Sequence, residues 1–283
     1  MKFGTFITKQ HGDAIAADVR RAEQLGFESV WIPEHLIMPV KQASAYPYAD
    51  DGRFPAPPDV PFHDPLLVLA YVAALTNRIR LATGIFVLPL RNPFATAKAI
   101  ATLDNLSEGR IIFGVGIGWQ KEEFEAVGMK FEDRALRTRE YLELMIELWS
   151  KSDPLYQGKT VATQGMKFMP KTVQQPHPPI VFGGTTEAAL KRTVRLGDGW
   201  YGITHSLEET RTLISRLGEY SRAAGRTRPI EITISLRTGK PLTTDDVRRL
   251  AELGVHRTLF GHPVKTLPIS ELERFRAEIM DKM

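Results

Sequence analysis

Short runs of apolar residues alternate along this chain with segments whose apolar positions recur at helical spacing. Residues 2–7 form the first run, and residues 13–27 follow with Ile15, Val19 and Ala22 on one helical face. Several runs are continuously apolar, which is typical of parallel strands that are buried on both faces. The pattern therefore predicts strands and helices in regular alternation.

The alternation continues to the C-terminus and gives about eight strand–helix units. The predicted strands cover residues 2–7, 29–33, 78–88, 110–116, 179–184, 198–203, 230–236 and 256–261. The predicted helices cover residues 13–27, 64–76, 92–107, 133–150, 186–197, 207–225, 243–254 and 269–280.

Local signals mark several of these boundaries. Asp64 and Asn92 are each followed by a proline, Pro65 and Pro93, which is the typical start of a helix. Gly26 stands where the first helix is expected to end.

Two segments interrupt the alternation. Residues 38–62 and 151–177 are rich in proline and glycine and show no regular periodicity. An open doubly wound sheet usually has about five or six strands, so this number of units favours a closed barrel. We therefore predict one α/β domain over residues 1–283, a (β/α)8 TIM barrel with insertions after strand 2 and between helix 4 and strand 5.

Composition narrows the class of protein. Hydrophobic residues make up 43% of the chain and charged residues 25%, as in a soluble enzyme, and the net charge of +4 is too small to indicate a nucleic-acid partner. Cysteine is absent, which excludes disulfides and thiolate chemistry. The apolar runs are too short for a signal peptide or a membrane span, so we expect a cytoplasmic protein without a membrane partner. No H-x-H, H-E-x-x-H or G-x-S-x-G motif occurs, and we expect no metal.

The stretch "GRIIFGVGIGW" carries Gly114, Gly116 and Gly118 after the fourth predicted strand. A dinucleotide fingerprint would need another glycine where Trp119 stands, and it would follow the first strand of a βαβ unit. The glycines instead lie at the C-terminal end of a barrel strand, where active sites form. There they allow a flat ring to approach the backbone, or they form a tight turn that binds nothing.

Candidate functional residues also follow other predicted strands. Glu34 and His35 follow strand 2, and they are candidates for proton transfer, although a single histidine is often structural. Gly84, after Thr83, interrupts strand 3, which indicates a close backbone approach or a simple kink.

After strand 5, the residues Gly183, Gly184 and Thr185 precede a helix whose free amides suit a phosphate. An ordinary cap by Thr185 or Thr186, with nothing bound, explains the same residues equally well.

Together these segments resemble the bacterial luciferase-like monooxygenases and deazaflavin-dependent oxidoreductases. The resemblance spans nearly the whole chain and is carried by "GFESVWIPEH", "RIRLATGIFVLPLRNPFATAKAIATLDNLSEGRIIFGVGIGWQKEEFEAVG", "PPIVFGG" and "LGDGW". The run "YPYADDGRFPAPPDVPFHDPLLVLA" is most similar to the actinobacterial branch that uses coenzyme F420.

The resemblance implies a homodimeric barrel that binds the cofactor at the strand ends. It implies a cis peptide between Gly84 and Ile85, with a bulge against the central ring. Glu34 and His35 would lie beside the ring, where His35 is the candidate acid or base and Glu34 orients it or bonds the ring. The remaining cofactor contacts implied are Thr83, Gly116, Ile117, Gly118 and Trp119 near the ring, and Gly183, Gly184 and Thr185 at the phosphate.

One position departs from the family. The sugar-phosphate dehydrogenase branch has a glutamate where this chain has Trp119, which argues against a sugar-phosphate substrate. Glu122 and Glu123 follow shortly after and are possible replacements.

We therefore predict an F420-dependent oxidoreductase that transfers a hydride to or from a small organic substrate. The alternatives are an FMN-dependent monooxygenase of the same fold and a non-catalytic protein that binds a flavin or deazaflavin. Aromatic residues of the first insertion either line the substrate mouth or only pack over the rim of the barrel: Tyr46, Tyr48, Phe54 and Phe62.

Overall fold

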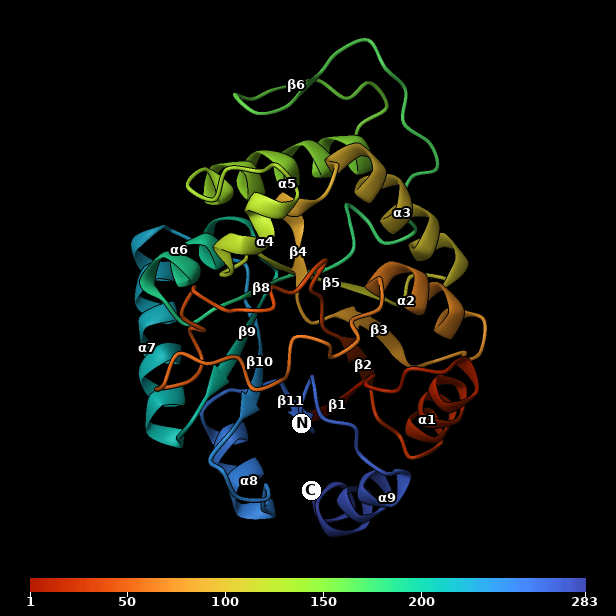
Figure 1. Cartoon of the computed structure of the whole chain (residues 1–283), viewed down its shortest axis with the longest axis vertical. Coiled ribbons are helices and arrows are strands. Elements are labelled where there is room, and N and C mark those ends of the chain that lie inside the picture. Colours follow the sequence, from red (N-terminus) through yellow and green to blue (C-terminus); the bar gives the residue numbers. More distant parts are fainter.

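Parallel strand pairing runs around the whole main sheet and closes it into a barrel (Figure 1). The computed structural model describes residues 1–283. Its strands are β1 (Lys2–Phe6), β2 (Ser29–Ile32), β3 (Arg80–Thr83), β4 (Phe86–Val87), β5 (Ile111–Gly116), β8 (Ile180–Gly183), β9 (Gly199–Thr204), β10 (Glu231–Leu236) and β11 (Arg257–Phe260). The order is β3-β2-β1-β11-β10-β9-β8-β5-β4, and a further pairing of β3 with β5 closes the ring. The predicted (β/α)8 barrel is confirmed.

Helices surround the strands and connect them in sequence (Figure 1). The principal helices are α1 (Gly12–Gln24), α2 (Pro65–Ala73), α3 (Pro93–Leu106), α5 (Arg134–Ser150), α6 (Glu187–Leu196), α7 (Leu207–Ala223), α8 (Thr244–Glu252) and α9 (Ile269–Glu278). No helix combines the length and the apolar character that crossing a membrane requires.

The predicted helix boundaries are confirmed where a capping residue marked them. The Asp64 carboxylate accepts the amides of Leu66 and Leu67 at the start of α2. Asn92 accepts the amide of Ala95 in the same way at the start of α3. These side chains satisfy backbone donors that have no partner inside the helix.

The third predicted strand, residues 78–88, is not continuous. It splits into β3 and β4, and the peptide bond between Gly84 and Ile85 is cis, as the resemblance implied. A Cβ atom on Gly84 would lie 2.9 Å from Cε3 of Trp31, so the chain passes very close to the tryptophan ring. The break lies at Gly84, where the sequence indicated a close backbone approach or a kink, and the contact with Trp31 confirms the close approach.

Both predicted insertions are present. The segment between β2 and α2 contains no helix or strand, and it crosses the centre of the view in Figure 1 in orange. The segment between α5 and β8 carries the short hairpin of β6 (Tyr156–Gln157) and β7 (Ala162–Thr163). A short helix that was not predicted, α4 (Lys121–Ala126), stands between β5 and α5.

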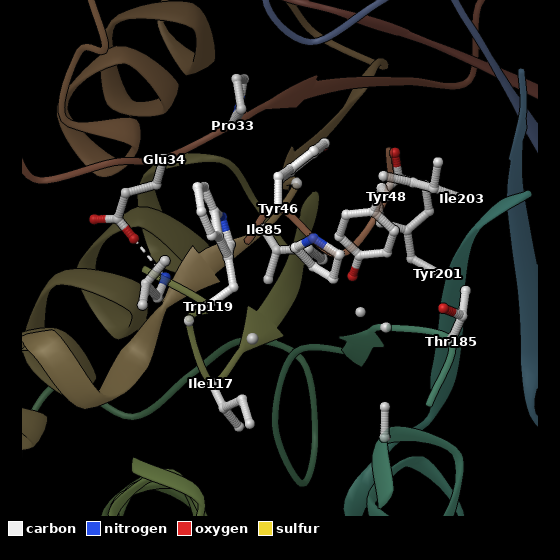
Figure 2. A pocket seen from close by; sticks show the side chains of 18 of the residues that line it. Pro33, Glu34, Tyr46, Tyr48, Ile85, Ile117, Trp119, Thr185, Tyr201 and Ile203 are labelled. Atoms are coloured by element: carbon white, nitrogen blue, oxygen red, sulfur yellow. Dashed lines mark hydrogen bonds between the residues drawn. The ribbon is translucent and has the colours of Figure 1, made fainter. Parts of the chain in front are cut away.

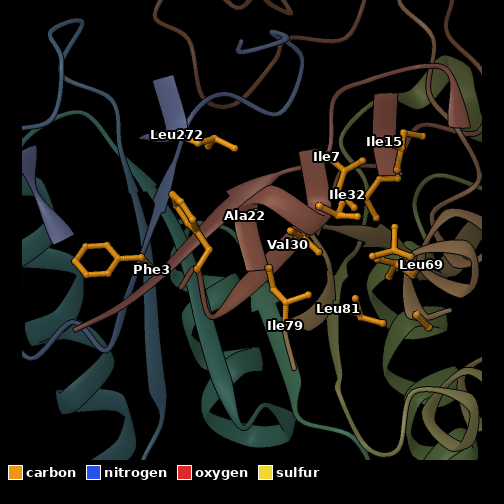
Figure 3. Close-up of a cluster of buried hydrophobic side chains, with 14 of the residues drawn as sticks. Phe3, Ile7, Ile15, Ala22, Val30, Ile32, Leu69, Ile79, Leu81 and Leu272 are labelled. Atoms are coloured by element: carbon orange, nitrogen blue, oxygen red, sulfur yellow. The ribbon is translucent and has the colours of Figure 1, made fainter. Parts of the chain in front are cut away.

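The barrel is packed on both of its faces. Its interior holds one layer of buried side chains, Trp31, Ala82, Ile112, Val181, Tyr201 and Leu259. The largest outer cluster fills the space between β1–β3 and the helices α1, α2 and α9 (Figure 3). With the interior filled by side chains, the open space of the barrel is left at its rim.

A buried charge network closes the N-terminal end of the barrel. Arg257 is fully buried, and its guanidinium bonds both carboxylate oxygens of Glu28 at 2.7 Å. It also pairs with Glu231 at 2.5 Å. This end is therefore a structural one, and the polar groups available for chemistry lie at the other end.

Candidate functional site

A cavity of about 530 Å³ opens at the C-terminal ends of the barrel strands (Figure 2). Its walls come from the segments that follow β2, β3, β5, β8 and β11, from Val87 of β4, from β9, and from the insertion before α2. The predicted site residues that line it are Glu34, His35, Gly84, Ile85, Gly116, Ile117, Gly118, Trp119, Gly183, Gly184 and Thr185. The predicted aromatic residues of the insertion, Tyr46, Tyr48, Phe54 and Phe62, line it as well.

Thr83 is the one candidate that does not reach the cavity. Its side chain is buried, and its hydroxyl donates to the carbonyl of Gly114 at 2.7 Å. Thr83 therefore joins β3 to β5 beneath the cavity, and its predicted contact with a cofactor has no support in this geometry.

Ile85 forms the floor of the cavity, and two of the predicted glycines make room for it. A Cβ atom on Gly116 would lie 2.9 Å from Cγ2 of Ile85, and one on Gly183 would lie 2.9 Å from its Cγ1. Larger residues at these positions would collide with Ile85 whether or not a ligand is bound. Neither the flat ring nor the tight turn considered for Gly116, nor the phosphate contact considered for Gly183, included this packing against Ile85.

His35 is oriented by a carboxylate from the unpredicted helix α4. Its Nδ1 lies 3.1 Å from Oε2 of Glu123, and the exposed fraction of the Glu123 side chain is 1%. The other carboxylate oxygen accepts the amide of Leu36 at 2.5 Å. No protein group bonds Nε2 of His35, although this ring lines the cavity. Glu123 thus has the orienting position that the sequence analysis offered to Glu34.

Glu34 lies on the same wall but has other partners. Its carboxylate accepts the amide of Val87 at 2.6 Å (Figure 2) and pairs with Arg91. Burial raises the pKa of Glu34 to about 7, although Arg91 and the Val87 amide both oppose this shift. The group therefore changes its protonation near neutral pH within reach of the cavity.

An aromatic wall, defined here as Tyr46, Phe54, Phe62 and Trp119, covers His35. The imidazole meets the rings of Phe54, Phe62 and Trp119 edge-on, with centroid distances of 5.3, 5.1 and 5.8 Å. Phe54 stacks on Trp119 with an interplanar angle of 21°. These contacts enclose His35 in apolar surroundings and shield it from water.

Glu122 holds the insertion that carries this wall. Its carboxylate accepts the amides of Ala43 at 2.5 Å and Ser44 at 2.9 Å, and the hydroxyl of Ser44 at 2.6 Å. Burial alone would raise the pKa of Glu122, but these hydrogen bonds lower it to about 2. The two neighbouring glutamates of α4 therefore have distinct tasks, one toward the insertion and one toward His35.

The opposite side of the cavity suits an anion. Gly184 and Thr185 line it next to the start of α6, where Thr186 caps the helix by accepting the amide of Ala189. Arg134 and Arg192 line the same cavity. Burial lowers the pKa of Arg192, and the nearby charge of Arg134 lowers this pKa further. Both arginines line the cavity that the start of α6 borders, although Nε and Nη1 of Arg134 already donate to the carbonyls of Gly118 and Phe131. Cationic side chains beside a helix N-terminus are typical of phosphate sites.

Arg91, Arg134 and Arg192 were not predicted as site residues, and the role of Glu123 was left open. Arg192 lies in the second turn of α6, where its spacing from Gly184 is a usable signal once a helix is assumed. Glu123 depends on α4, whose six residues are too few to show a helical period. Arg134 is the first residue of α5, a predicted helix, but nothing in the sequence shows that its side chain reaches the cavity.

Comparison with known proteins agrees with this architecture. The family model described as luciferase-like monooxygenase matches residues 1–275. The uncharacterized protein Rv0953c of Mycobacterium tuberculosis is 37% identical over 265 residues, covering 93% of this chain and 92% of the relative. The F420-dependent glucose-6-phosphate dehydrogenase of Kineococcus radiotolerans is 31% identical over 246 residues, covering 83% of this chain and 67% of the relative. The structure of the F420-dependent tetrahydromethanopterin reductase of Methanopyrus kandleri superposes with a TM-score of 0.78 at 19% identity, covering 99% of each chain.

Proposed function

The chain belongs to the luciferase-like monooxygenase family, and from this premise we propose that it transfers a hydride between coenzyme F420 and a small organic substrate. The observation that carries the proposal is the layout of one cavity. Arg134, Arg192 and Gly184 line the same cavity as His35, whose Nδ1 bonds Glu123. A phosphorylated ring bound between them would have its reacting part near the imidazole.

The residues present fit such a group. A volume of about 530 Å³ is within the range of cofactor pockets, which is roughly 300–1,000 Å³. The two arginines and the amides at the start of α6 would hold a phosphate, and Ile85 would support the ring from below. Glu34 and the backbone from Gly116 to Gly118 would bond its edges. When bound, a deazaflavin supplies a carbon centre that accepts or gives a hydride.

In this proposal, His35 is the residue that accepts and donates the proton of the reaction. Glu123 accepts from Nδ1, so the neutral imidazole presents Nε2 as an acceptor toward the cavity. There it takes the proton of a substrate hydroxyl during oxidation, or returns it to a carbonyl oxygen during reduction. The aromatic wall excludes water from this transfer.

Deazaflavin is preferred over FMN because the "YPYADDGRFPAPPDVPFHDPLLVLA" run resembles the F420 branch and the relative from Kineococcus is named for F420. We do not propose the sugar-phosphate substrate of that relative for this chain, because Trp119 stands where the sugar-phosphate dehydrogenase branch has a glutamate. An FMN-dependent monooxygenase remains the second candidate, supported by the name of the family itself. The homodimer, the small-molecule partner and the cytoplasmic location stay predictions.

The experiment that tests the proposal compares two reactions of the same purified protein. Under anaerobic conditions, reduced F420 is mixed with enones, imines and ketones, and oxidised F420 with alcohols, and the absorbance of the oxidised cofactor is followed. In parallel, oxygen uptake is measured with reduced FMN. We expect turnover only in the F420 arm. Oxygen uptake coupled to FMN, without F420 turnover, would establish the monooxygenase instead.

A variant of His35 separates both enzymes from a protein that only binds a cofactor. His35→Ala is expected to abolish turnover while it leaves cofactor binding intact. His63→Ala, a change at a half-buried histidine that bonds the Gln10 carbonyl and lies outside the cavity lining, is the matched control. Activity that is unchanged in His35→Ala would remove His35 from the mechanism.

A further inference from the structure

Arg237 lies at the rim of the barrel with no acidic partner. It directly follows β10, and its electrostatic influence reaches Tyr46 of the insertion, Tyr201 of β9 and His262 after β11. Tyr46 and Tyr201 line the cavity. Arg237 therefore stands behind the cavity wall, at a place that neither His35 nor the phosphate end uses.

One edge of its guanidinium is unpaired. Nε and Nη2 of Arg237 are both buried and have no hydrogen-bond partner, and the hydroxyl of Tyr201 is in the same condition. Buried charged donors without an acceptor are destabilising, and native proteins rarely keep them. The phenol oxygens of Tyr46 and Tyr201 are the acceptors near Arg237, but neither completes a well-aligned hydrogen bond with its Nε or Nη2.

The charges around this edge all have one sign. Burial raises the pKa of Tyr201, and Arg237 and Ser235 oppose that rise. Burial lowers the pKa of His262 to about 4, and Arg237 and Lys265 lower it further. No carboxylate acts on either group, so an anionic ligand group would be the first negative charge in this region.

The geometry of the edge selects the kind of anion. Nε and Nη2 lie on the same side of a guanidinium and direct two parallel N–H bonds outward, which matches the two oxygens of a carboxylate. The phosphate-type site with two arginines lies elsewhere in the cavity, at Arg134 and Arg192.

We propose that Arg237 and Tyr201 form a subsite for the carboxylate of an organic acid substrate, whose apolar body lies along the aromatic wall. Tyr46 and Tyr201 line the cavity and interact with Arg237, which lies outside the lining, so the proposal requires the ring of Tyr46 to move when the acid binds. That the bound acid is a substrate rests on the proposed function. That an acid binds at Arg237 does not depend on it.

The test measures binding by calorimetry in the absence of any cofactor. The probes are benzoate, cinnamate and 3-phenylpropanoate, each paired with its neutral amide. We expect the wild-type protein to bind at least one acid at least tenfold more tightly than its amide. Arg237→Gln should abolish this preference without changing the affinity for the amide.

Arg226→Gln is the matched control, because Arg226 also has a buried Nη2 without a partner but lines a separate pocket that contains neither Tyr46 nor Tyr201. It should keep the full preference. Tyr201→Phe removes one hydroxyl only, and it should lower the affinity for the acid by at least threefold. It keeps the proposal testable if Arg237→Gln fails to fold.

Several results would overturn the subsite: no binding of any acid, equal binding of acid and amide, a preference that survives both variants, or displacement of cinnamate by an equal concentration of inorganic phosphate. F420 titration of the same preparations keeps the two proposals apart. If the wild-type protein binds F420 but shows no preference for acids, only the subsite proposal is rejected. If it binds acids but not F420, only the proposed cofactor is rejected.

Discussion

At the scale of single residues, the site places two buried glutamates on one wall and gives them different environments. Glu123 accepts hydrogen bonds from His35 and from the amide of Leu36. Glu34 pairs with Arg91 and the amide of Val87, and its pKa is raised to about 7 by burial. The first environment orients an imidazole, and the second one titrates near neutral pH.

Glu123→Gln tests the orienting role. The amide has the same shape, but it can present its NH2 group to Nδ1 and so favour the wrong tautomer of His35. We expect kcat to fall by about 10² while the affinity for F420 changes less than threefold. Nitrogen chemical shifts of the His35 ring should report the change of tautomer. Glu125→Gln, on the exposed face of the same helix, is the control and should leave kcat unchanged. An unaltered kcat in Glu123→Gln would show that His35 needs no carboxylate.

Glu34→Gln tests the shifted titration. Because the pKa in the folded protein lies above the ordinary 4.5, the folded state holds the proton more tightly than the unfolded state does. The contribution of Glu34 to stability is therefore fully present below pH 4.5 and is lost as the pH rises toward 7. At about 1.4 kcal/mol per pH unit, the wild type should lose roughly 3 kcal/mol relative to Glu34→Gln across this range. Urea unfolding at several pH values measures the difference, and parallel curves for the two proteins would contradict the assignment.

The sequence could identify Glu34 and His35 as candidates because both follow a strand directly. It could not assign their partners. Arg91 reaches Glu34 from beyond β4, and Glu123 reaches His35 from a helix six residues long. Such contacts depend on the path of the loops, which has no periodic signature in the chain.

At the scale of elements, β5 shows how close backbone contacts determine the glycine pattern. A Cβ atom on Gly114 would lie 1.9 Å from the carbonyl oxygen of Thr83, and Thr83 in turn donates its hydroxyl to the Gly114 carbonyl. The first of the three glycines is thus required by strand packing. The third, Gly118, has a positive φ of 78° and turns the chain toward Trp119 and α4.

Gly114→Ala tests this packing. The added methyl group overlaps with backbone, which cannot move aside as a flexible side chain would, so we expect a loss of at least about 3 kcal/mol in the free energy of unfolding. Gly218→Ala in the middle of α7 is the control. Its new Cβ would lie 3.4 Å from the nearest atom, on a flexible arginine, and should be neutral or slightly stabilising. Equal stability of Gly114→Ala and the wild type, measured by urea unfolding, would reject the packing explanation.

At the scale of the whole molecule, the barrel gathers residues that lie far apart in the sequence at one rim. The eight-unit rhythm, the caps at Asp64 and Asn92 and both insertions could be predicted because each depends on local chemistry or on periodicity. The proposed anion-binding end could be predicted only at Gly184 and Thr185, where glycine and a helix start mark it. Arg134 and Arg192 belong to different helices, and only the closed barrel brings them to the same cavity.

The most direct measurement of the central claim is a fluorescence titration of the purified protein with oxidised F420, alongside an identical titration with FMN. The proposal predicts saturable binding of F420, weaker binding of FMN, and at least a tenfold loss of F420 affinity in Arg192→Gln but not in the exposed control Arg211→Gln. Saturation by FMN with no binding of F420 over the same concentrations would contradict it.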